Sequence, residues 1–311
     1  MNILWPAYVL YMFAVTAQSI HRGHARALLA HLKYQALLLG AFVMIVPFYW
    51  MLITSLKGAN EAMAYPPQWW PARPLWGNYA EAWFKPDVAY DGTVFGLERL
   101  LKGFGLYYWV SLYSGFLTTV GTLFTSILAA YAFSHMEFWG KNLFFYVVLA
   151  TMMVPGQVLI IPNFIILAKL NWLDTYKALV VPWLASVFSI FLIRQFFMTL
   201  PNDLWDASQI DGAGRWRFLW RVLIPLSKPV LITSALFTFI NQWNSLLWPL
   251  VVTSRPEMRT LMVGLQVFTN DSGSDFHLLM AASTFSVLPI VIVFFFVQRF
   301  FIEGIARSGL K

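Results

Sequence analysis

The chain lacks cysteine and carries little charge. Without cysteine it forms neither disulfide bonds nor thiolate-ligated metal sites. Of its 311 residues only 11% are Asp, Glu, Lys or Arg, whereas 59% are hydrophobic and 18% are aromatic. This composition excludes an ordinary soluble globular protein. It is typical of an all-α protein that crosses a membrane several times.

Two further absences limit the function. No basic residue precedes the first apolar stretch (3–20), and no clear small-residue cleavage site follows it, so a secretory signal peptide is not expected. The sequence also has no G-x-x-x-x-G-K-[ST] motif. The nearest stretch, GAGRWR (212–217), lacks the Lys-Ser/Thr ending that contacts phosphate and magnesium. We therefore expect no ATP site, no cofactor and no nucleic-acid partner for this chain.

Six apolar stretches are long enough to cross the hydrocarbon core as helices. They comprise residues 34–56, 103–136, 142–168, 178–193, 229–254 and 276–298. Residues 3–20 form either an additional span or a peripheral helix, or they follow a misassigned start codon. Prolines at 47, 155, 162 and 182 lie inside or at the ends of spans, where neighbouring helices can satisfy the backbone groups that proline frees.

The distribution of Lys and Arg gives an orientation. If the 34–56 span begins in the cytoplasm, the cytoplasmic side holds 12 of the 21 basic and 5 of the 14 acidic residues, and the other side holds nine of each. The whole net charge of +7 then lies on the cytoplasmic side. Three parts follow: an N-terminal segment with a basic linker (1–33), a transmembrane domain (34–302) and a cytoplasmic tail (303–311).

The cytoplasmic loop at about 194–224 contains the polar stretch DASQIDGAGRWRFLWRVLIPL (206–226). Asn202 or Asp203 is suited to cap a helix start, and Gly212 to the left-handed residue that ends a helix. A second short helix follows, in which an apolar stripe suited to the membrane surface is formed by Trp216, Leu219, Trp220 and Leu223. The stretch is either an ordinary amphipathic connector or a rigid projection that fits a groove on a cytoplasmic partner.

Two spans carry polar residues at helical spacing. In the second span Ser114, Thr118, Thr122, Ser126 and Ala130 recur every four residues, which favours close helix packing over the lining of a translocation path. In the fifth span Asn241 and Asn244 are candidates for lining a translocation path, and Trp243 for stacking on a sugar ring. Hydrogen bonding between helices is the alternative for these amides.

Other chemistry finds less support. His21 and His24 lie in a basic run, while His135 and His277 stand alone. Asp87 and Asp91 lie four apart in a loop without a sign of acid–base chemistry. A stand-alone secondary transporter is one alternative function, but it would be expected to carry acidic residues at the centres of its spans, and the six spans have none there. A membrane-embedded enzyme, such as a glycosyltransferase, would need a cluster of acidic residues or a metal motif.

The stretch 206–213, DASQIDGA, followed by Ile224-Pro225, closely resembles the EAA loop of ABC importer permeases, whose pattern is roughly E-A-A-x-x-D-G-A. Asp206 and Ser208 depart from that pattern but keep its charge or small size. Further segments resemble the carbohydrate-importer branch, the MalG-like permeases. They are VPFYWMLITSLK (46–57), AYAFSHMEFWGKN (130–142), MMVPGQVLIIP (152–162), RQFF (194–197), FTFINQWNSLLWPL (237–250) and QRFFIEGIARSGLK (298–311).

This resemblance implies the six-helix transmembrane domain of a type I ABC importer in the inner membrane of a prokaryote. It implies a second permease subunit, two ATP-binding subunits, an extracytoplasmic solute-binding protein and a sugar or polyol solute. ATP hydrolysis would belong to the separate subunits. The EAA loop (about 200–225) would contact them through Asp206, Ala207, Ser208, Asp211, Gly212 and Ala213. The last external loop (about 253–275) would reach the binding protein, and the tail would touch the ATPases.

Overall fold

The structure, a computed structural model, describes residues 25–86, 102–269 and 275–308. Within these ranges the regular structure is entirely helical. The α-helices are α2 (Ala25–Ser55), α3 (Ala59–Ala62), α4 (Gly77–Phe84), α5 (Phe104–His135), α6 (Lys141–Ala150), α7 (Ile160–Lys169), α8 (Tyr176–Val180), α9 (Val187–Phe197), α10 (Asp203–Ile210), α11 (Arg215–Phe218), α12 (Ile224–Leu226), α13 (Lys228–Trp243), α14 (Leu247–Val252), α15 (Leu261–Gly264) and α16 (Phe276–Ser308). The alternatives for residues 3–20 lie outside the described residues.

The six expected spans are of two kinds. Three are single long helices that cover Leu32–Ser55, Phe104–His135 and Phe276–Gln298. Three are helix pairs with a sharp bend: Lys141–Met153 with Gly156–Lys169 (88°), Tyr176–Trp183 with Val187–Phe197 (42°), and Arg215–Leu226 with Lys228–Trp243 (80°). The all-helical, six-span prediction is confirmed with each bent pair counted as one span.

Three of the predicted spans, 142–168, 178–193 and 229–254, are interrupted rather than continuous helices. Val154 and Pro155 are extended, since proline disfavours helical geometry in the residue before it, and this separates the halves of the first pair. The fifth span breaks after Trp243, and α14 follows only at Leu247. Pro47 and Pro289, in contrast, lie inside the continuous α2 and α16. The sequence identifies where prolines occur, but packing decides which of them break a helix.

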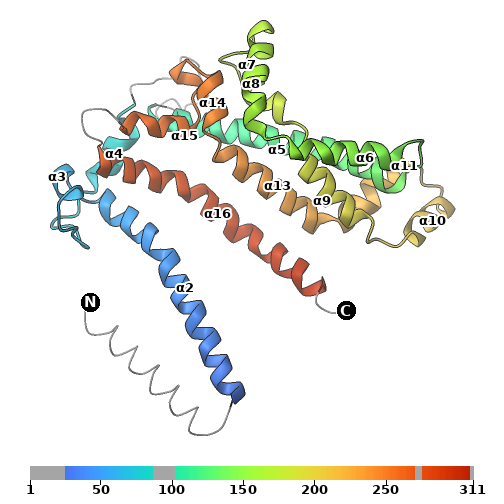
Figure 1. Ribbon diagram of the computed structural model, residues 1–311, viewed down its shortest axis with the longest axis horizontal. Helices are drawn as coiled ribbons and strands as arrows, with labels where there is room; N and C mark the ends of the chain where they lie inside the picture. Colours follow the sequence, from blue (N-terminus) through green and yellow to red (C-terminus); the bar gives the residue numbers. More distant parts are fainter. Residues whose placement is uncertain (1–24, 87–101, 270–274, 309–311) are drawn as a thin grey trace.

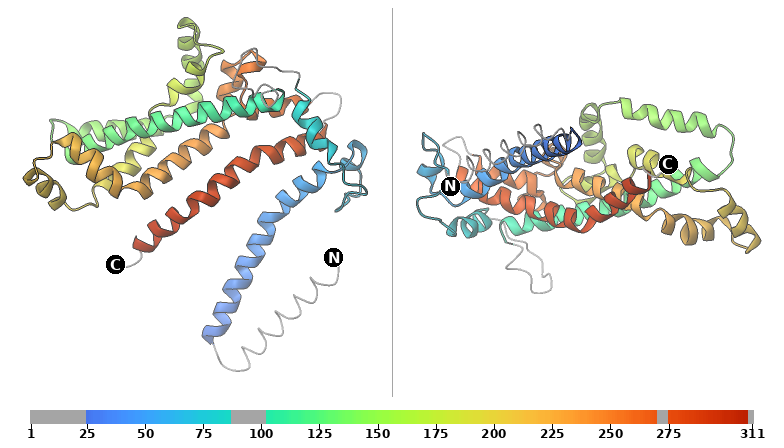
Figure 2. Two further views of the ribbon diagram at one scale, coloured as in Figure 1. Left: turned by 180° about the vertical axis from the view of Figure 1, so that it is seen from behind. Right: turned by 90° about the horizontal axis from the view of Figure 1, so that it is seen from below.

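Helix α5 is the centre of the bundle. It packs against α9 and α13, while α16 packs against α13 and α2 (Figures 1 and 2). Helix α2 meets α16 at the end that carries α3 and α4 and diverges from it toward its own N-terminal end (Figure 1), and most of its described side chains are exposed. The helix α16 runs unbroken to Ser308, so the expected tail continues the last span as far as that residue.

The two ends of the bundle differ. One end carries α3, α4, α14 and α15, and the opposite end carries α10 and α11 (Figure 1). This arrangement agrees with the alternation of sides deduced from charge. The functional candidates lie at two levels, one at the α10 end and one midway along α5.

Candidate functional site

At the α10 end, residues 203–213 form a short helix and a tight turn, which we call the knob. Asp203 and Asp206 occupy the first turn of α10, where the positive end of the helix dipole favours carboxylates. Asn202 precedes the helix but makes no capping bond with its side chain. In the part of the chain described, neither Asp206 nor Asp211 forms an ion pair, so both carboxylates are available to a partner.

The knob ends in a turn that requires Gly212. This residue has φ +69°, in the left-handed region, and its amide donates to the carbonyl of Gln209 at 3.0 Å. The Ala213 amide donates to the carbonyl of Ser208 at 2.8 Å. This pair of bonds is a Schellman motif, which satisfies the last carbonyls of the helix and fixes the direction of the following chain. The prediction that Gly212 ends the helix in the left-handed conformation is confirmed.

The exposed face of the knob differs slightly from the residues that sequence predicted. Asp206, Ala207, Asp211 and Gly212 are exposed, whereas Ala213 is half-buried. Ser208 is buried, and its hydroxyl donates to the carbonyl of Trp205 at 2.7 Å. Sequence reasoning missed Ile210, which is 88% exposed at the tip of the knob. The sequence signal for this exposed residue was a single isoleucine directly before the Asp-Gly pair that ends the helix.

The inner face of the knob is anchored in an aromatic cluster. The Trp205 and Phe218 rings meet edge to face at 5.0 Å between centroids. Phe218, Leu219 and Leu223 are fully buried against Ile127, Ala130 and Tyr131 of α5 and against Ile193 and Phe197 of α9. The Tyr131 hydroxyl donates to the Arg215 carbonyl at 3.3 Å. The knob is therefore held on two spans rather than on a free loop.

The prediction that Trp216, Leu219, Trp220 and Leu223 form a single membrane-facing surface is wrong. Trp216 and Trp220 are exposed and contact each other at 5.7 Å between ring centroids. Leu219 and Leu223 point inward to the cluster just described. The backbone over Leu219–Leu223 is a π-helical turn, which changes the angular spacing and separates the four side chains onto two faces.

The second site is a cavity of about 400 Å³ midway along α5. It lies where two spans break, after Trp183 and after Trp243. Its lining residues are Thr118, Thr122, Trp183, Ala185, Ser186, Thr238, Asn241, Gln242 and Ser245. A cavity of about 430 Å³ adjoins it and shares Trp183 and Ser245.

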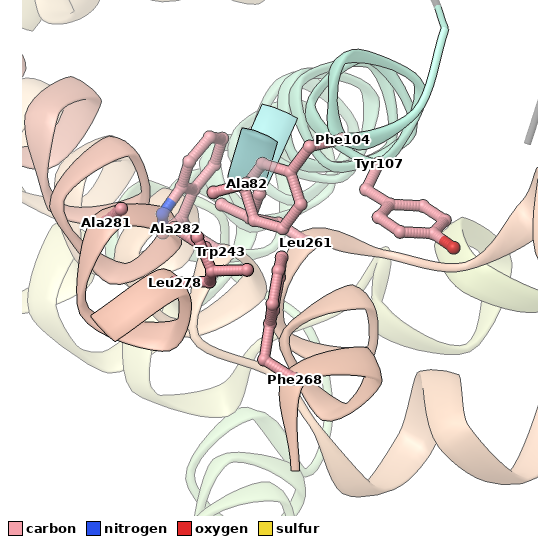
Figure 3. Packing of buried hydrophobic residues seen from close by; sticks show 9 residues of the cluster. All are labelled: Ala82, Phe104, Tyr107, Trp243, Leu261, Phe268, Leu278, Ala281 and Ala282. Carbon is pink, nitrogen blue, oxygen red and sulfur yellow. The ribbon is translucent and has the colours of Figure 1, made fainter. Parts of the chain in front are cut away.

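The three predicted path residues separate. Asn241 lines the first cavity and Asn244 the second, and both are exposed. Trp243 is 1% exposed and packs among Phe104, Leu278 and their neighbours (Figure 3). Its indole N–H donates to the Ser286 carbonyl at 3.0 Å. This position does not fit the prediction of sugar stacking, because the ring is enclosed by protein and its polar atom is already bonded.

The small-residue stripe of α5 has two roles. All five residues from Ser114 to Ala130 are buried, as close helix packing requires. The Thr122 hydroxyl also donates to the Trp183 carbonyl at 2.8 Å, which satisfies a backbone group at the break after α8. Thr118 and Thr122 line the cavity as well. The sequence favoured packing over the lining of a path for this stripe, whereas two of its residues both pack and line the cavity.

The last external loop is mostly folded onto the bundle. Leu261, Val263 and Phe268 are buried, and the longest exposed run among the described residues of the loop is Ser254–Glu257. One carboxylate oxygen of Asp174 accepts from the amides of Ser254 and Arg255 at 2.6 and 2.8 Å, and so holds this turn in place. Residues 270–274 of the predicted loop lie outside the described residues.

Among the described residues, no group of three or more His, Cys, Asp or Glu side chains could hold a metal ion. Comparisons with known proteins decide the family. Residues 121–307 match the family described as binding-protein-dependent transport system inner membrane component. The chain belongs to this family.

Two relatives and one solved structure extend the comparison. The sn-glycerol-3-phosphate transport system permease protein UgpE of Yersinia pestis bv. Antiqua (strain Antiqua) is 36% identical over 88% of this chain and 94% of its own length. The arabinooligosaccharides transport system permease protein AraQ of Bacillus subtilis (strain 168) is 36% identical over 72% of this chain and 79% of its own length. A bacterial ABC transporter involved in the import of alginate is 23% identical, with a TM-score of 0.73, over 89% of this chain and 99% of the matched chain. The chain is a multi-pass permease component of a binding-protein-dependent transport system, and its fold is that of an ABC importer permease.

Proposed function

We propose that this chain is one of two permease subunits of an ATP-driven importer in a prokaryotic inner membrane. A solute-binding protein delivers a sugar or polyol, and two separate ATP-binding subunits hydrolyse ATP. Membership in a binding-protein-dependent family argues against the stand-alone secondary transporter and the membrane-embedded enzyme. The names of UgpE and AraQ, which refer to a polyol phosphate and to oligosaccharides, support a hydroxyl-rich solute.

One observation carries the coupling role of the knob. Its exposed face combines two free carboxylates with the apolar tip Ile210, while its inner face is fixed to α5 and α9. A small apolar tip within a charged rim suits insertion into a cleft of a cytoplasmic partner. Because the inner face of the knob is packed against α5 and α9, displacement of the knob is transmitted to these spans rather than absorbed by a flexible loop.

Co-purification with the ATP-binding subunits tests this proposal. Asp206→Arg and Ile210→Arg place a cation on the docking face, and both should lower the amount of ATPase retained and abolish solute uptake. The matched control is Glu137→Arg, a charge reversal at an exposed residue after α5 and outside the knob. If the two knob variants retain the ATPases and transport as well as the control does, the knob is not the docking element.

The exposed turn Ser254–Glu257 is the proposed contact for the binding protein. It lies on the side that the charge distribution predicts to be external, and Asp174 fixes it. Crosslinking from a cysteine introduced at Glu257 tests this contact without background, since the chain has no native cysteine. Capture of the binding protein from Glu257→Cys, but not from a cysteine placed at Glu137 on the opposite side, is the expected result.

A further inference from the structure

The cavity midway along α5 has a lining of one chemical kind. Five hydroxyl side chains and two amides surround it, with Trp183 and Ala185 completing the described lining, and none of these residues is charged. Thr118 and Thr122 lie at the middle of the 32-residue α5, which places the cavity near the bilayer centre. Polar groups at that depth are costly unless they face a partner or an aqueous path.

One buried hydroxyl in this lining has no hydrogen-bond partner among the described residues. Thr118 is 1% exposed, and its Oγ1 makes no hydrogen bond. A buried, unsatisfied hydroxyl is unfavourable by itself, so its presence in the wall of a cavity indicates a bond supplied by something else. The hydroxyl next to it along the helix, that of Thr119, does not line the cavity and donates to the carbonyl of Gly115 at 2.7 Å.

We propose that this cavity is a translocation subsite contributed by this subunit, and that it takes an uncharged, hydroxyl-rich solute rather than a phosphate ester. The inference rests on the proposed function above and narrows its solute class. The Thr118 hydroxyl and the Asn241 amide bind solute hydroxyls. Trp183, which is 38% exposed and borders both cavities, offers an aromatic face to the apolar side of a sugar ring.

The charge of this subunit's part of the lining distinguishes the two solute classes. A phosphate monoester carries about −1.5 to −2 charges at neutral pH and is bound in proteins by Arg, Lys or a metal ion. The described lining supplies only neutral dipoles, which are well matched to hydroxyl groups that both donate and accept. A phosphate without a cationic partner would lose its hydration without replacement. UgpE is named for such a phosphate ester, so the inference separates this chain from the solute in that relative's name.

The position of the cavity also suits a solute path. Both spans that form its walls with α5 are broken there, one after Trp183 and the other after Trp243. Irregular backbone at membrane depth is tolerated where it lines a cavity, and transporters place solute sites at such discontinuous helices. The adjoining cavity, reached past Trp183 and Ser245, extends the polar space beyond the first one.

The test uses the complete importer in proteoliposomes, with its partner permease, ATPases and solute-binding protein. ATP-dependent uptake of arabinotriose, maltotriose, glycerol and sn-glycerol 3-phosphate is measured side by side. We expect uptake of at least one neutral solute and none of the phosphate ester. Uptake of the ester, or of no solute in the panel, overturns the inference. In either case ATPase activity stimulated by the binding protein still supports the proposed function, and loss of that stimulation counts against the proposed function itself.

Two threonine variants test the residue assignment. Thr118→Val removes the unpartnered hydroxyl and keeps the side-chain shape, so it should leave thermal stability unchanged or raised. Uptake of the neutral solute should nevertheless fall about 2- to 12-fold, the range for one lost hydrogen bond, while stimulated ATPase activity persists. Thr119→Val, the matched control, should leave uptake unchanged. Unaltered uptake in Thr118→Val overturns the assignment, because the hydroxyl would then not bind the solute. A loss of stability in that variant also overturns it, because the hydroxyl would then form a hydrogen bond to the partner subunit.

Discussion

The turn at Gly212 gives the sharpest test of the knob. Gly212 has φ +69°, whereas Gly214, two residues later, has φ −75° and ψ 168°, which any residue adopts. At both positions an added Cβ would meet no atom within 4 Å. Gly212→Ala and Gly214→Ala therefore add the same methyl group without a steric clash, and only Gly212→Ala places it in the left-handed region.

The expected magnitude follows from the cost of that backbone conformation. A non-glycine residue in the left-handed region costs about 1–2 kcal/mol. The turn can relieve this cost only by giving up its two closing bonds, from Gly212 to Gln209 and from Ala213 to Ser208. If docking requires the intact turn, the affinity for the ATPase subunits should fall about 5- to 30-fold in Gly212→Ala. Gly214→Ala should leave that affinity unchanged.

The assay is binding of the ATP-binding subunits to the purified permease complex, with solute uptake measured in parallel. Gly212→Asn provides a graded third point, because asparagine tolerates the left-handed region better than alanine does. The predicted order of affinity is wild type, Gly212→Asn, then Gly212→Ala. Equal affinity in all three proteins, or equal loss in Gly212→Ala and Gly214→Ala, would refute a role for the Schellman turn in docking.

Three further predictions concern other parts of the structure. Trp243→Phe removes the indole donor to the buried Ser286 carbonyl, so it should destabilise the protein by about 1–3 kcal/mol in thermal unfolding. The preference among solutes should stay unchanged. An altered preference would show that the Trp243 ring contacts the solute. Asp174→Ala removes the acceptor of the Ser254 and Arg255 amides, so hydrogen exchange in that turn should accelerate about 10-fold or more. Asp174→Asn keeps a side-chain oxygen and should change the exchange rate less. Ser208→Leu overfills a buried position and should destabilise the knob by about 1–3 kcal/mol, but Ser208→Ala should be nearly neutral for ATPase binding; the reverse order would place this side chain on the docking face.

Local chemistry made much of this structure predictable. Hydropathy identifies the six spans because the requirement for about 20 apolar residues depends on the bilayer and not on the fold. Gly212 was predictable for a similar reason: an Asp-Gly pair at the end of a short polar helix has few alternatives to the left-handed turn. The resemblance to ABC importer permeases then implied that the partner of the knob is an ATP-binding subunit, which residue spacing alone left undetermined.

Side-chain direction was less predictable, because it depends on which helix face meets a neighbour. Trp243 lies between two cavity-lining amides in sequence, but its own direction on α13 is toward α16. The stripe from Trp216 to Leu223 separated because a π-helical turn changes its angular spacing, and no residue in the sequence marks that turn. Pro155 breaks a span, whereas Pro47 does not, although both lie in apolar surroundings.

The two candidate sites are close enough to share their supports. The cluster that anchors the knob includes Ile127 of α5, which lies five residues along the same helix from Thr122 in the cavity wall. Helix α9 contributes to the same cluster at its far end, and its first residues follow directly on Ser186, another wall residue. A displacement that moved the knob and the cluster as a unit would act on both helices, which border the cavity. The knob and the polar cavity therefore share two supporting helices, α5 and α9.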